Sequence, residues 1–484
     1  MVNKFGSSLV FFLLLTFISS CALYTNPKAP LLQTPTTFKN ANKFTCTNLK
    51  DHWWQNFDDE ELNRLVNLAL QNNLNYQIAL KNIQIARTYI MENASSLFPQ
   101  ANLNLGAARN AISKNALSDK YVNVTPLYNL YQLNGTVSYE ADVWSRIRNS
   151  VKQAITNVKV SEADGDVIKL ALISSVVDSY WQIVALNSNL ANLKQQYNAA
   201  SEIARLNQDQ YKGGLVNVEP IANAKTQVEN IKSNINNLEK QRQILLNTLA
   251  YLVGTYPENF DFNIGSTLPN SGANFTHMLP PKISSKMLIN RPDIQSSFYT
   301  VISYGYAQKQ SLSAFFPTFM LTGAYGFASL GLGNFTAGGS MLWNFGATAV
   351  QTLFDLGKTY CRYKRARLQY EAAVLTYKNT VVNAFMEVNN ALASYQQDYL
   401  ALKASHNVVR LAKEKLDLAN AQYKSGVINY TTYLGYKLIF LQSKYTLTSQ
   451  AQTLTSDVIQ TYKTLGMGLS LDPVPKKTQL ADTI

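Results

Sequence analysis

The longest uninterrupted pattern in the chain is helical and runs from Gly357 to Gly426. No proline or glycine lies between these two residues, and the stretch consists mostly of Ala, Leu, Lys, Gln, Tyr and Val, which helices accept well. At 1.5 Å per residue, a continuous helix here would be roughly 100 Å long. That is several times the length of an ordinary globular helix. We therefore expect one side of an extended, coiled-coil-like object.

Two stretches in the first half instead alternate between apolar and polar residues, as β-strands do. The shorter one covers 101–107, where Ala and Leu alternate with Asn and Gly. The longer one covers 131–143, and its apolar face carries Tyr131, Leu133, Gly135, Val137, Tyr139, Ala141 and Val143. Its other face is polar throughout and carries Gln132, Asn134, Thr136, Ser138, Glu140 and Asp142.

This alternation is what a strand of a membrane barrel requires, with lipid outside and water inside. A half-buried sheet of a soluble protein would show the same period. The length of the strand and its fully polar second face favour the water-filled interior. Asn134, Glu140 and Asp142 are therefore candidate pore-lining residues.

Helix-start signals stand ahead of other periodic stretches. One helix is expected to begin after Trp53, where Asp58 and Glu61, three residues later, form a capping-box pattern. Another begins at Pro292 and Asp293, because proline fits an early helical position and an acid suits the positive end of a helix.

The second half of the chain repeats the first. Three landmarks recur in the same order at nearly one spacing: Phe98-Pro99 as Phe316-Pro317 (218 residues later), Asp142 as Asp355 (213) and Tyr211-Lys212-x-Gly214 as Tyr423-Lys424-x-Gly426 (212). Strand alternation also recurs, so each repeat supplies one β-hairpin and one long helical hairpin. We expect repeats at 53–265 and 283–469, a linker at 266–282 and a tail at 470–484.

The N-terminus has the features of an export signal. Lys4 precedes an apolar core, Leu9–Ile18, that is too short to span a bilayer as a folded helix. Ile18-Ser19-Ser20-Cys21 then resembles a bacterial lipobox, which predicts a signal peptide at 1–20 and lipidation of Cys21. An ordinary cleaved signal with a chance cysteine is the alternative. By resemblance to lipoproteins, Ala22 favours the outer membrane, and residues 21–52 form a proline-containing tether.

Composition excludes several functional classes. The formal charge is +13, but Lys and Arg are spread along the whole chain, which argues against nucleic-acid binding. The three histidines (His52, His277 and His406) are scattered, with no metal-ligand spacing and no nucleophile–base motif, so we expect no enzyme, cofactor or metal site. Cys46 and Cys361 are too few for a disulfide framework and are expected to be free.

Past residue 20, the chain has no run of about 18 apolar residues, so no spanning helix is expected. A protein of the outer membrane must then cross it as a closed β-barrel. Four strands per chain cannot close a barrel, so the chain must oligomerise. Two chains would give the bacterial minimum of eight strands and three would give twelve, and the polar inward face favours the wider barrel. The residues alone leave the stoichiometry open.

Four blocks of sequence together resemble a known family. They are Ser138-Tyr139-Glu140-Ala141-Asp142-Val143-Trp144-Ser145-Arg146-Ile147-Arg148, Asn290-Arg291-Pro292-Asp293-Ile294, Leu353-Phe354-Asp355-Leu356-Gly357 and the two Tyr-Lys-x-Gly turns. The chain resembles the TolC-type outer-membrane factors, specifically their lipoprotein, NodT-like efflux branch, from about Trp53 to Leu469.

The resemblance implies a mixed α and β fold. A homotrimer would build a twelve-stranded transmembrane barrel from four strands per chain, and the long helical hairpins would form a tunnel across the periplasm of a Gram-negative bacterium. It implies passive conduction and two partners, a periplasmic adaptor and an inner-membrane efflux pump. The adaptor would dock at the two hairpin tips, at Tyr211, Gly214, Leu215, Tyr423, Gly426 and Val427.

The gate of such a channel is harder to predict. Family members carry carboxylates just after the second tip, at positions that match about Thr432 or Gly435, but residues 431–436 contain no acid. The candidate gate residues are Glu219, Thr432, Tyr433 and Tyr436. A channel for type I protein secretion, or a structural coiled-coil lipoprotein, remains an alternative, and the transported substrate is not set by the sequence.

Overall fold

The computed structural model describes residues 26–30, 32, 34–35, 37–38, 52–111, 127–268, 288 and 290–468. The predicted signal peptide, Cys21, Cys46, most of the predicted linker and the predicted tail lie outside these residues. The chain forms two compact units. Unit 1 comprises 1–31, 82–161 and 296–377, and unit 2 comprises 32–81, 162–295 and 378–484. Each unit therefore draws on both halves of the sequence.

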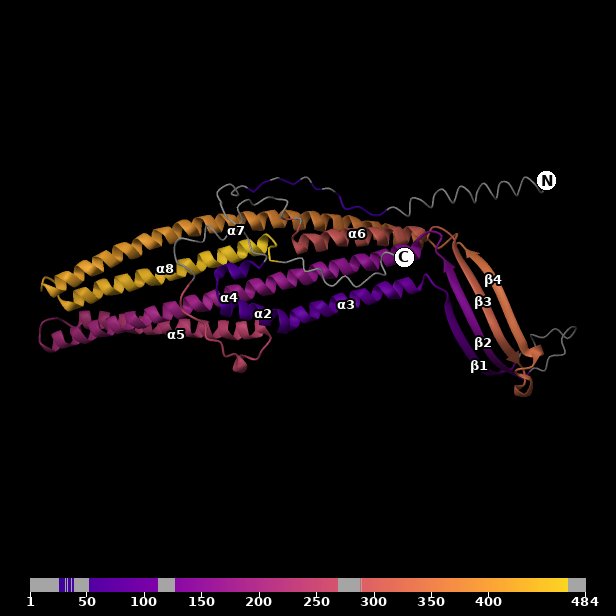
Figure 1. The fold of residues 1–484 in the computed structure, drawn as a ribbon, viewed down its shortest axis with the longest axis horizontal. Helices are drawn as coiled ribbons and strands as arrows, with labels where there is room; N and C mark the ends of the chain where they lie inside the picture. Colours follow the sequence, from indigo (N-terminus) through magenta and orange to yellow (C-terminus); the bar gives the residue numbers. More distant parts are fainter. Residues whose placement is uncertain are drawn as a thin grey trace. The chain divides into compact units, whose positions relative to one another are not determined.

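The two halves build matching elements of equal length (Figure 1). The matched pairs are α3 (Leu74–Ser95) and α6 (Pro292–Ser313) with 22 residues each, β1 (Gln100–Ala111) and β3 (Thr318–Ser329) with 12, α4 (Arg146–Lys212) and α7 (Lys358–Lys424) with 67, and α5 (Glu219–Val253) and α8 (Tyr430–Thr464) with 35. The duplication predicted from the sequence is thus present in the fold, and the predicted long helix is α7.

The remaining elements do not form pairs of equal length. They are the 3-10 helices η3 (Trp53–Phe57), η5 (Pro257–Asn259), η8 (Leu332–Asn334) and η9 (Gly338–Ser340), the helix α2 (Glu60–Asn72), and the strands β2 (Leu127–Ala141) and β4 (Met341–Val350). The capping box predicted at Asp58 is wrong. Asp58 adopts a left-handed backbone conformation after η3, and the side chain of Asp59 caps α2 by accepting from the Leu62 N–H at 2.9 Å.

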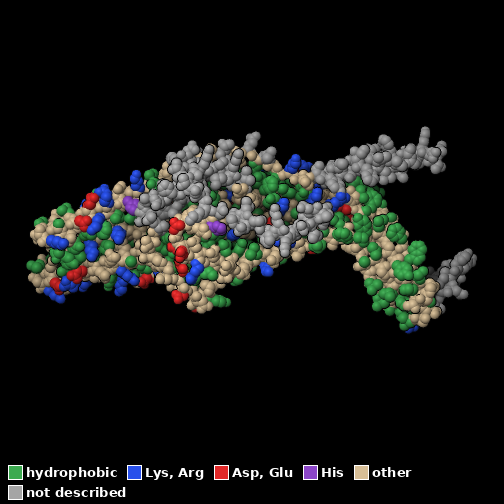
Figure 2. Space-filling view, viewed as in Figure 1, with side chains coloured by type: hydrophobic (Ala, Val, Ile, Leu, Met, Phe, Trp, Pro, Cys, Tyr) green, Lys and Arg blue, Asp and Glu red, His purple; other side chains and the backbone are tan. Residues whose placement is uncertain are grey.

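Unit 1 contains one antiparallel sheet with the strand order β1-β2-β3-β4. Its register pairs Leu105 with Leu133, Leu133 with Phe327 and Phe327 with Met341, so the apolar positions of all four strands share one face. This face is exposed: Leu105 is 81% and Phe345 is 77% accessible. Figure 2 shows hydrophobic side chains gathered over the strands. An apolar face this exposed requires an apolar partner such as lipid.

Unit 2 holds the largest buried core. Trp53 of η3 stacks on Tyr462 of α8, with ring centroids 4.9 Å apart, and apolar side chains of α2, α4 and α5 surround the pair. The Tyr180 hydroxyl of α4 donates to Asp59 Oδ2 at 2.8 Å, which links the cap of α2 to this core. The sequence segment after the tether is therefore an integral part of unit 2.

One helix among the described residues, α4, contains an 18-residue stretch long and apolar enough to cross a membrane, judged by length and composition alone. Most of that stretch is buried in the fold. Ile173, Val177 and Val184 of α4 belong to the unit 2 core, so packing against neighbouring helices already accounts for its apolar character.

A pair of carboxyl groups lies between α7 and α8 in unit 2. Asp457 of α8 is hydrogen-bonded to Asp398 of α7, and its Oδ2 is buried with no other hydrogen-bond partner among the described residues. Burial, together with the neighbouring Asp398 carboxyl, raises the pKa of Asp457 to about 7. Two carboxyls this close share a proton more readily than they ionise together.

The shared proton predicts a pH-dependent stability. Because the pKa of Asp457 is higher in the folded than in the unfolded chain, its contribution is fully present below the unfolded pKa and is lost as the pH rises through about 7. We expect D457N to unfold at a higher temperature than the wild type at pH 8 and to lose this advantage at pH 5, as followed by circular dichroism in detergent. D417N, on the exposed surface of α7, is the control and should leave the pH profile unchanged. Parallel profiles for D457N and the wild type would contradict the shared proton.

Candidate functional site

The junction between β2 and α4 is built around Asp142. Its carboxylate accepts from the backbone N–H groups of Ile147 and Arg148 at 2.9 Å each and from Arg148 Nε at 3.1 Å. These are unsatisfied donors at the start of α4, where negative charge is favourable. The Asp142 side chain is only 6% accessible, so its prediction as a pore-lining residue is corrected: it caps the helix.

The second repeat uses Asp355 in the same way at the start of α7. Asp355 accepts from Thr359 Oγ1 at 2.6 Å and from the Thr359 N–H at 2.9 Å. These hydrogen bonds hold the pKa of the Asp355 carboxyl below its ordinary value. Leu356 and Gly357 before the helix both have positive φ, which gives the chain its sharp change of direction. The repeated aspartate is therefore a device for turning a strand into a helix.

The two other predicted pore-lining residues, Glu140 and Asn134, lie in different environments. Glu140 forms a bidentate ion pair with Arg146, at 2.9 and 2.7 Å, so its charge is neutralised. Asn134 lies on the polar face of β2 opposite Asn104 and Gly326 and stays a candidate for the pore.

Trp144 ties the first repeat to the second within unit 1. Its indole Nε1–H donates to the Pro317 carbonyl at 2.8 Å, and its ring stacks on Phe316 with centroids 4.7 Å apart. The Trp of one motif thus meets the Phe-Pro landmark of the other repeat, a contact that sequence spacing alone gives no sign of.

Arg291 is a second long-range contact, in unit 2. Its buried guanidinium forms ion pairs with Asp293 and with Glu387 of α7, both at 2.7 Å, and donates to the Thr464 carbonyl at the end of α8. Gly466 packs directly against it, with a positive φ of 68°. The Arg-Pro-Asp motif therefore does more than start α6, because it joins the middle of α7 to the end of α8.

The two helical hairpins of unit 2 end in the same turn. Gly214 has a φ of 73° and Gly426 a φ of 75°, a left-handed conformation that glycine adopts without strain. The Leu215 N–H donates to the Gln210 carbonyl at 2.9 Å, and the Val427 N–H donates to the Gln422 carbonyl at 2.8 Å. This six-residue pattern is a Schellman motif, and it explains why the sequence repeats Tyr-Lys-x-Gly.

Each tip presents an exposed apolar side chain at the predicted docking position. Leu215 is 77% accessible and Val427 is 70% accessible. Tyr211 and Tyr423 are also exposed beside them. Apolar groups this exposed at a hairpin end fit a contact with another protein.

The gate candidates lie just beyond the tips and have different environments. Tyr433 stacks with Tyr423 and Tyr430, with centroids 5.8 Å apart, and packs on a hydrophobic cluster of α4, α5 and α8. The Thr432 N–H donates to the capping side chain of Asn429 at 2.8 Å. Tyr436 is on the accessible side of α8, and Glu219 lies in the first turn of α5. The first turn of α8 has no acidic residue.

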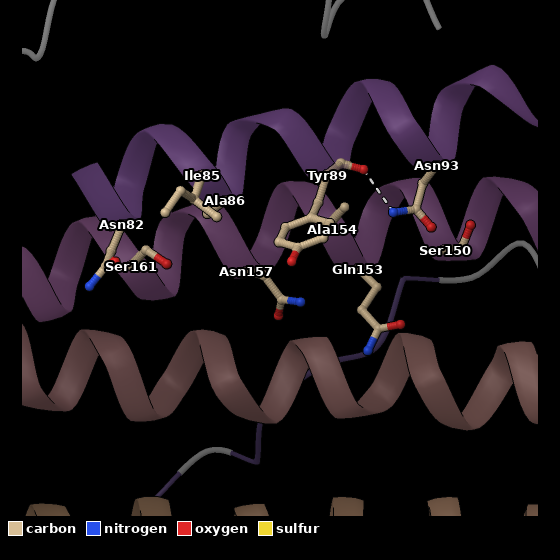
Figure 3. Close-up of a pocket in the computed structure, with 10 residues that line it drawn as sticks. All are labelled: Asn82, Ile85, Ala86, Tyr89, Asn93, Ser150, Gln153, Ala154, Asn157 and Ser161. Atoms are coloured by element: carbon tan, nitrogen blue, oxygen red, sulfur yellow. Dashed lines mark hydrogen bonds between the residues drawn. The ribbon is translucent and has the colours of Figure 1, made fainter. Parts of the chain in front are cut away.

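A groove of about 500 Å³ runs between α3 and α4 in unit 1 (Figure 3). Amide and hydroxyl side chains dominate its lining, among them Asn82 and Asn93 of α3 and Ser150, Gln153 and Asn157 of α4. No group of three or more His, Cys, Asp or Glu residues that could hold a metal occurs in the described part of the chain. Cys361 is a free, exposed thiol, as predicted.

Comparison with known proteins decides the family. The model of the outer membrane efflux protein family matches residues 65–255 and 283–466, one segment in each repeat. The chain belongs to the outer membrane efflux protein family. It is an outer-membrane efflux channel protein, and the family consists of transport channels, which confirms the resemblance drawn from the sequence motifs.

Individual relatives match over nearly the full length of the chain. The probable outer membrane lipoprotein SilC of Salmonella typhimurium is 25% identical over 94% of this chain and 97% of its own. The solvent efflux pump outer membrane protein SrpC of Pseudomonas putida is 27% identical over 86% of this chain and 87% of its own. The crystal structure of the Campylobacter jejuni CmeC outer membrane channel superimposes with a TM-score of 0.84 and 26% identity, covering 92% of this chain and 94% of CmeC.

The capping role of Asp142 predicts a clear difference between two substitutions. D142A removes the acceptor of two backbone N–H groups and should lower the free energy of unfolding by about 1–2 kcal/mol. D142N keeps a side-chain acceptor and should lose less. Denaturant unfolding in detergent, followed by circular dichroism, measures both variants. If D142A were as stable as the wild type, Asp142 would not be the cap of α4.

Proposed function

We propose that three copies of this protein form the outer-membrane duct of a tripartite efflux system. The sheet of unit 1 carries the proposal. It has four strands, an exposed apolar face and two edges, β1 and β4, that each pair with one neighbour within the described sheet. In lipid such edges must be paired, and three sheets joined edge to edge give a closed barrel of twelve strands. A barrel of that size leaves room for a water-filled pore.

The exposed apolar stripe of α7 supports the same assembly. Leu368, Leu375 and Val382 are spaced by seven residues, so they share one side of the helix, and each is more than half exposed. Seven-residue spacing of apolar side chains is the pattern by which long helices pack against one another. In the proposed trimer this stripe packs against a helix of the neighbouring subunit.

The partners are inferred from the tips of the two helical hairpins. The exposed tips at Tyr211, Gly214 and Leu215 and at Tyr423, Gly426 and Val427 would receive a periplasmic adaptor, which connects the duct to an inner-membrane pump. Apolar side chains beside a tight glycine turn allow close approach of another hairpin. The duct itself conducts passively, and the pump supplies the energy.

Lipidation of Cys21 would anchor the N-terminus in the outer membrane. Residues 26–30 belong to unit 1, where Asn26 contacts Lys152 at 3.5 Å and the Tyr306 hydroxyl at 3.1 Å. The Tyr370 hydroxyl donates to the Lys28 carbonyl at 3.3 Å. The part of the predicted tether from Asn26 to Pro30 thus contacts α4, α6 and α7.

Efflux of small molecules is preferred to type I protein secretion because the family is that of outer membrane efflux proteins and the relative SrpC is named as part of a solvent efflux pump. The test is a gene deletion complemented with plasmid-borne variants. Wild type should restore tolerance to antibiotics and solvents, whereas L215D/V427D should be present in the outer membrane but fail to restore tolerance. The control Y256D, in the exposed loop after α5, should complement fully. Unchanged tolerance on deletion, with loss of a secreted protein, would favour the secretion channel.

The missing acids at the second tip predict weak block by divalent cations. In planar bilayers, millimolar Mg²⁺ on the periplasmic side should reduce the conductance of the wild-type channel only slightly, because the start of α8 offers no carboxylate ring. T432D should create such a ring and increase the block at least tenfold, while T432N leaves it unchanged. Strong block of the wild type at micromolar Mg²⁺ would contradict this interpretation.

A further inference from the structure

The first turns of α7 carry a concentrated positive charge. Residues 358–370 include five Lys or Arg residues and no Asp or Glu. Lys358, Arg362 and Arg365 are spaced by four and three residues and therefore share one face of the helix. All three are exposed, and none has an ion pair with another described residue, whereas Arg367 on another face pairs with Glu371 at 2.9 Å. We call Lys358, Arg362 and Arg365 the cationic row.

The repeat shows which side of the fold this row faces. At the offset of 212 residues that relates α4 to α7, Arg362 corresponds to Ser150 and Arg365 to Gln153. Ser150 and Gln153 line the groove between α3 and α4 (Figure 3). The cationic row thus occupies the positions in the second repeat that face the groove in the first.

The opposite side of α4 is identified by the tether. Lys152 of α4 contacts Asn26, and Tyr370 of α7 contacts the Lys28 carbonyl. Lys152 and Gln153 are adjacent in sequence, so their side chains point about 100° apart around the helix, and Lys152 is about 200° from Ser150. The tether side and the groove side of α4 are therefore different faces. In α7, Tyr370 is about 120° from Lys358 and about 140° from Arg365 around the helix, so these two cations also point away from the tether.

In the proposed trimer the tether side must be the outer side. Asn26 lies five residues after Cys21, whose lipid would be held in the membrane around the duct, so the tether runs along the outside. The sides of α4 and α7 that point away from the tether then face the interior. We propose that Lys358, Arg362 and Arg365 of the three subunits form a positively charged ring inside the tunnel, directly below the sheet, that binds small multivalent anions. This inference rests on the proposed trimer.

Little in the surroundings cancels this charge. Arg146, the counterpart of Lys358, is already neutralised by Glu140 at 2.7 Å. The groove-lining residues of α3 and α4 are uncharged. Like charges lining a narrow aqueous passage concentrate counter-ions within it. Arginine presents a planar fork that matches carboxylate and phosphate oxygens, so the ring suits di- and multivalent organic anions that carry these groups.

The test is the ion selectivity of the purified protein in planar bilayers. Under a KCl gradient, the wild-type reversal potential should lie nearer the chloride equilibrium potential than that of R362Q/R365Q. Pyrophosphate should block the wild-type current, and R362Q/R365Q should need at least tenfold more pyrophosphate for the same block. R362K/R365K keeps the charge and should retain anion preference with somewhat weaker block.

The control is K152Q, which removes a positive charge from the tether side of α4. It should leave both reversal potential and pyrophosphate block at wild-type values. Equal shifts in R362Q/R365Q and K152Q, or no shift in either, would overturn the cationic ring while leaving the channel intact. Absence of any conductance from the wild type would instead overturn the trimeric duct, and the ring with it.

Discussion

The constraint on which the rest of this structure depends is the incompleteness of its sheet. Four strands bring all their apolar positions to one exposed face, and the outer strands β1 and β4 have backbone groups still to be paired. Lipid can cover the apolar face, but it cannot form hydrogen bonds with the backbone groups of the edge strands. In the proposed trimer one chain is a third of the membrane structure, and the exposed apolar stripe of α7 is covered in the same assembly.

Each repeat uses the same local structures to pass from a strand into a long helix and to turn the chain back at the end of that helix. Asp142 and Asp355 satisfy the first N–H groups of the two 67-residue helices, and Gly214 and Gly426 end the same helices in matching turns. Because both repeats have the same caps and the same turns, their long helices are equal in length. The two repeats carry different charges at the acid-free start of α8 and at the cationic row of α7.

The sequence predicted the elements better than the roles of single polar residues. Periods of two and of 3.6 residues, with proline and glycine at the breaks, are local signals, so the strands, the long helices and the duplication were predictable. An acid on the polar face of a strand gives the same pattern whether it meets water or caps the next helix, so the sequence predicts a pore residue at Asp142 where the structure has a helix cap. The Arg291–Glu387 ion pair joins residues 96 apart and leaves no local signal. The side of the duct that Arg362 faces is inferred from the tether contact, which the structure supplies and the sequence does not.

The central claim is that three chains complete the sheet. Native mass spectrometry of the detergent-extracted, full-length protein measures this directly. The predicted result is a complex of three chains that dissociates only when detergent or heat also disrupts strand structure. A stable monomer or dimer that conducts ions in planar bilayers would contradict the account.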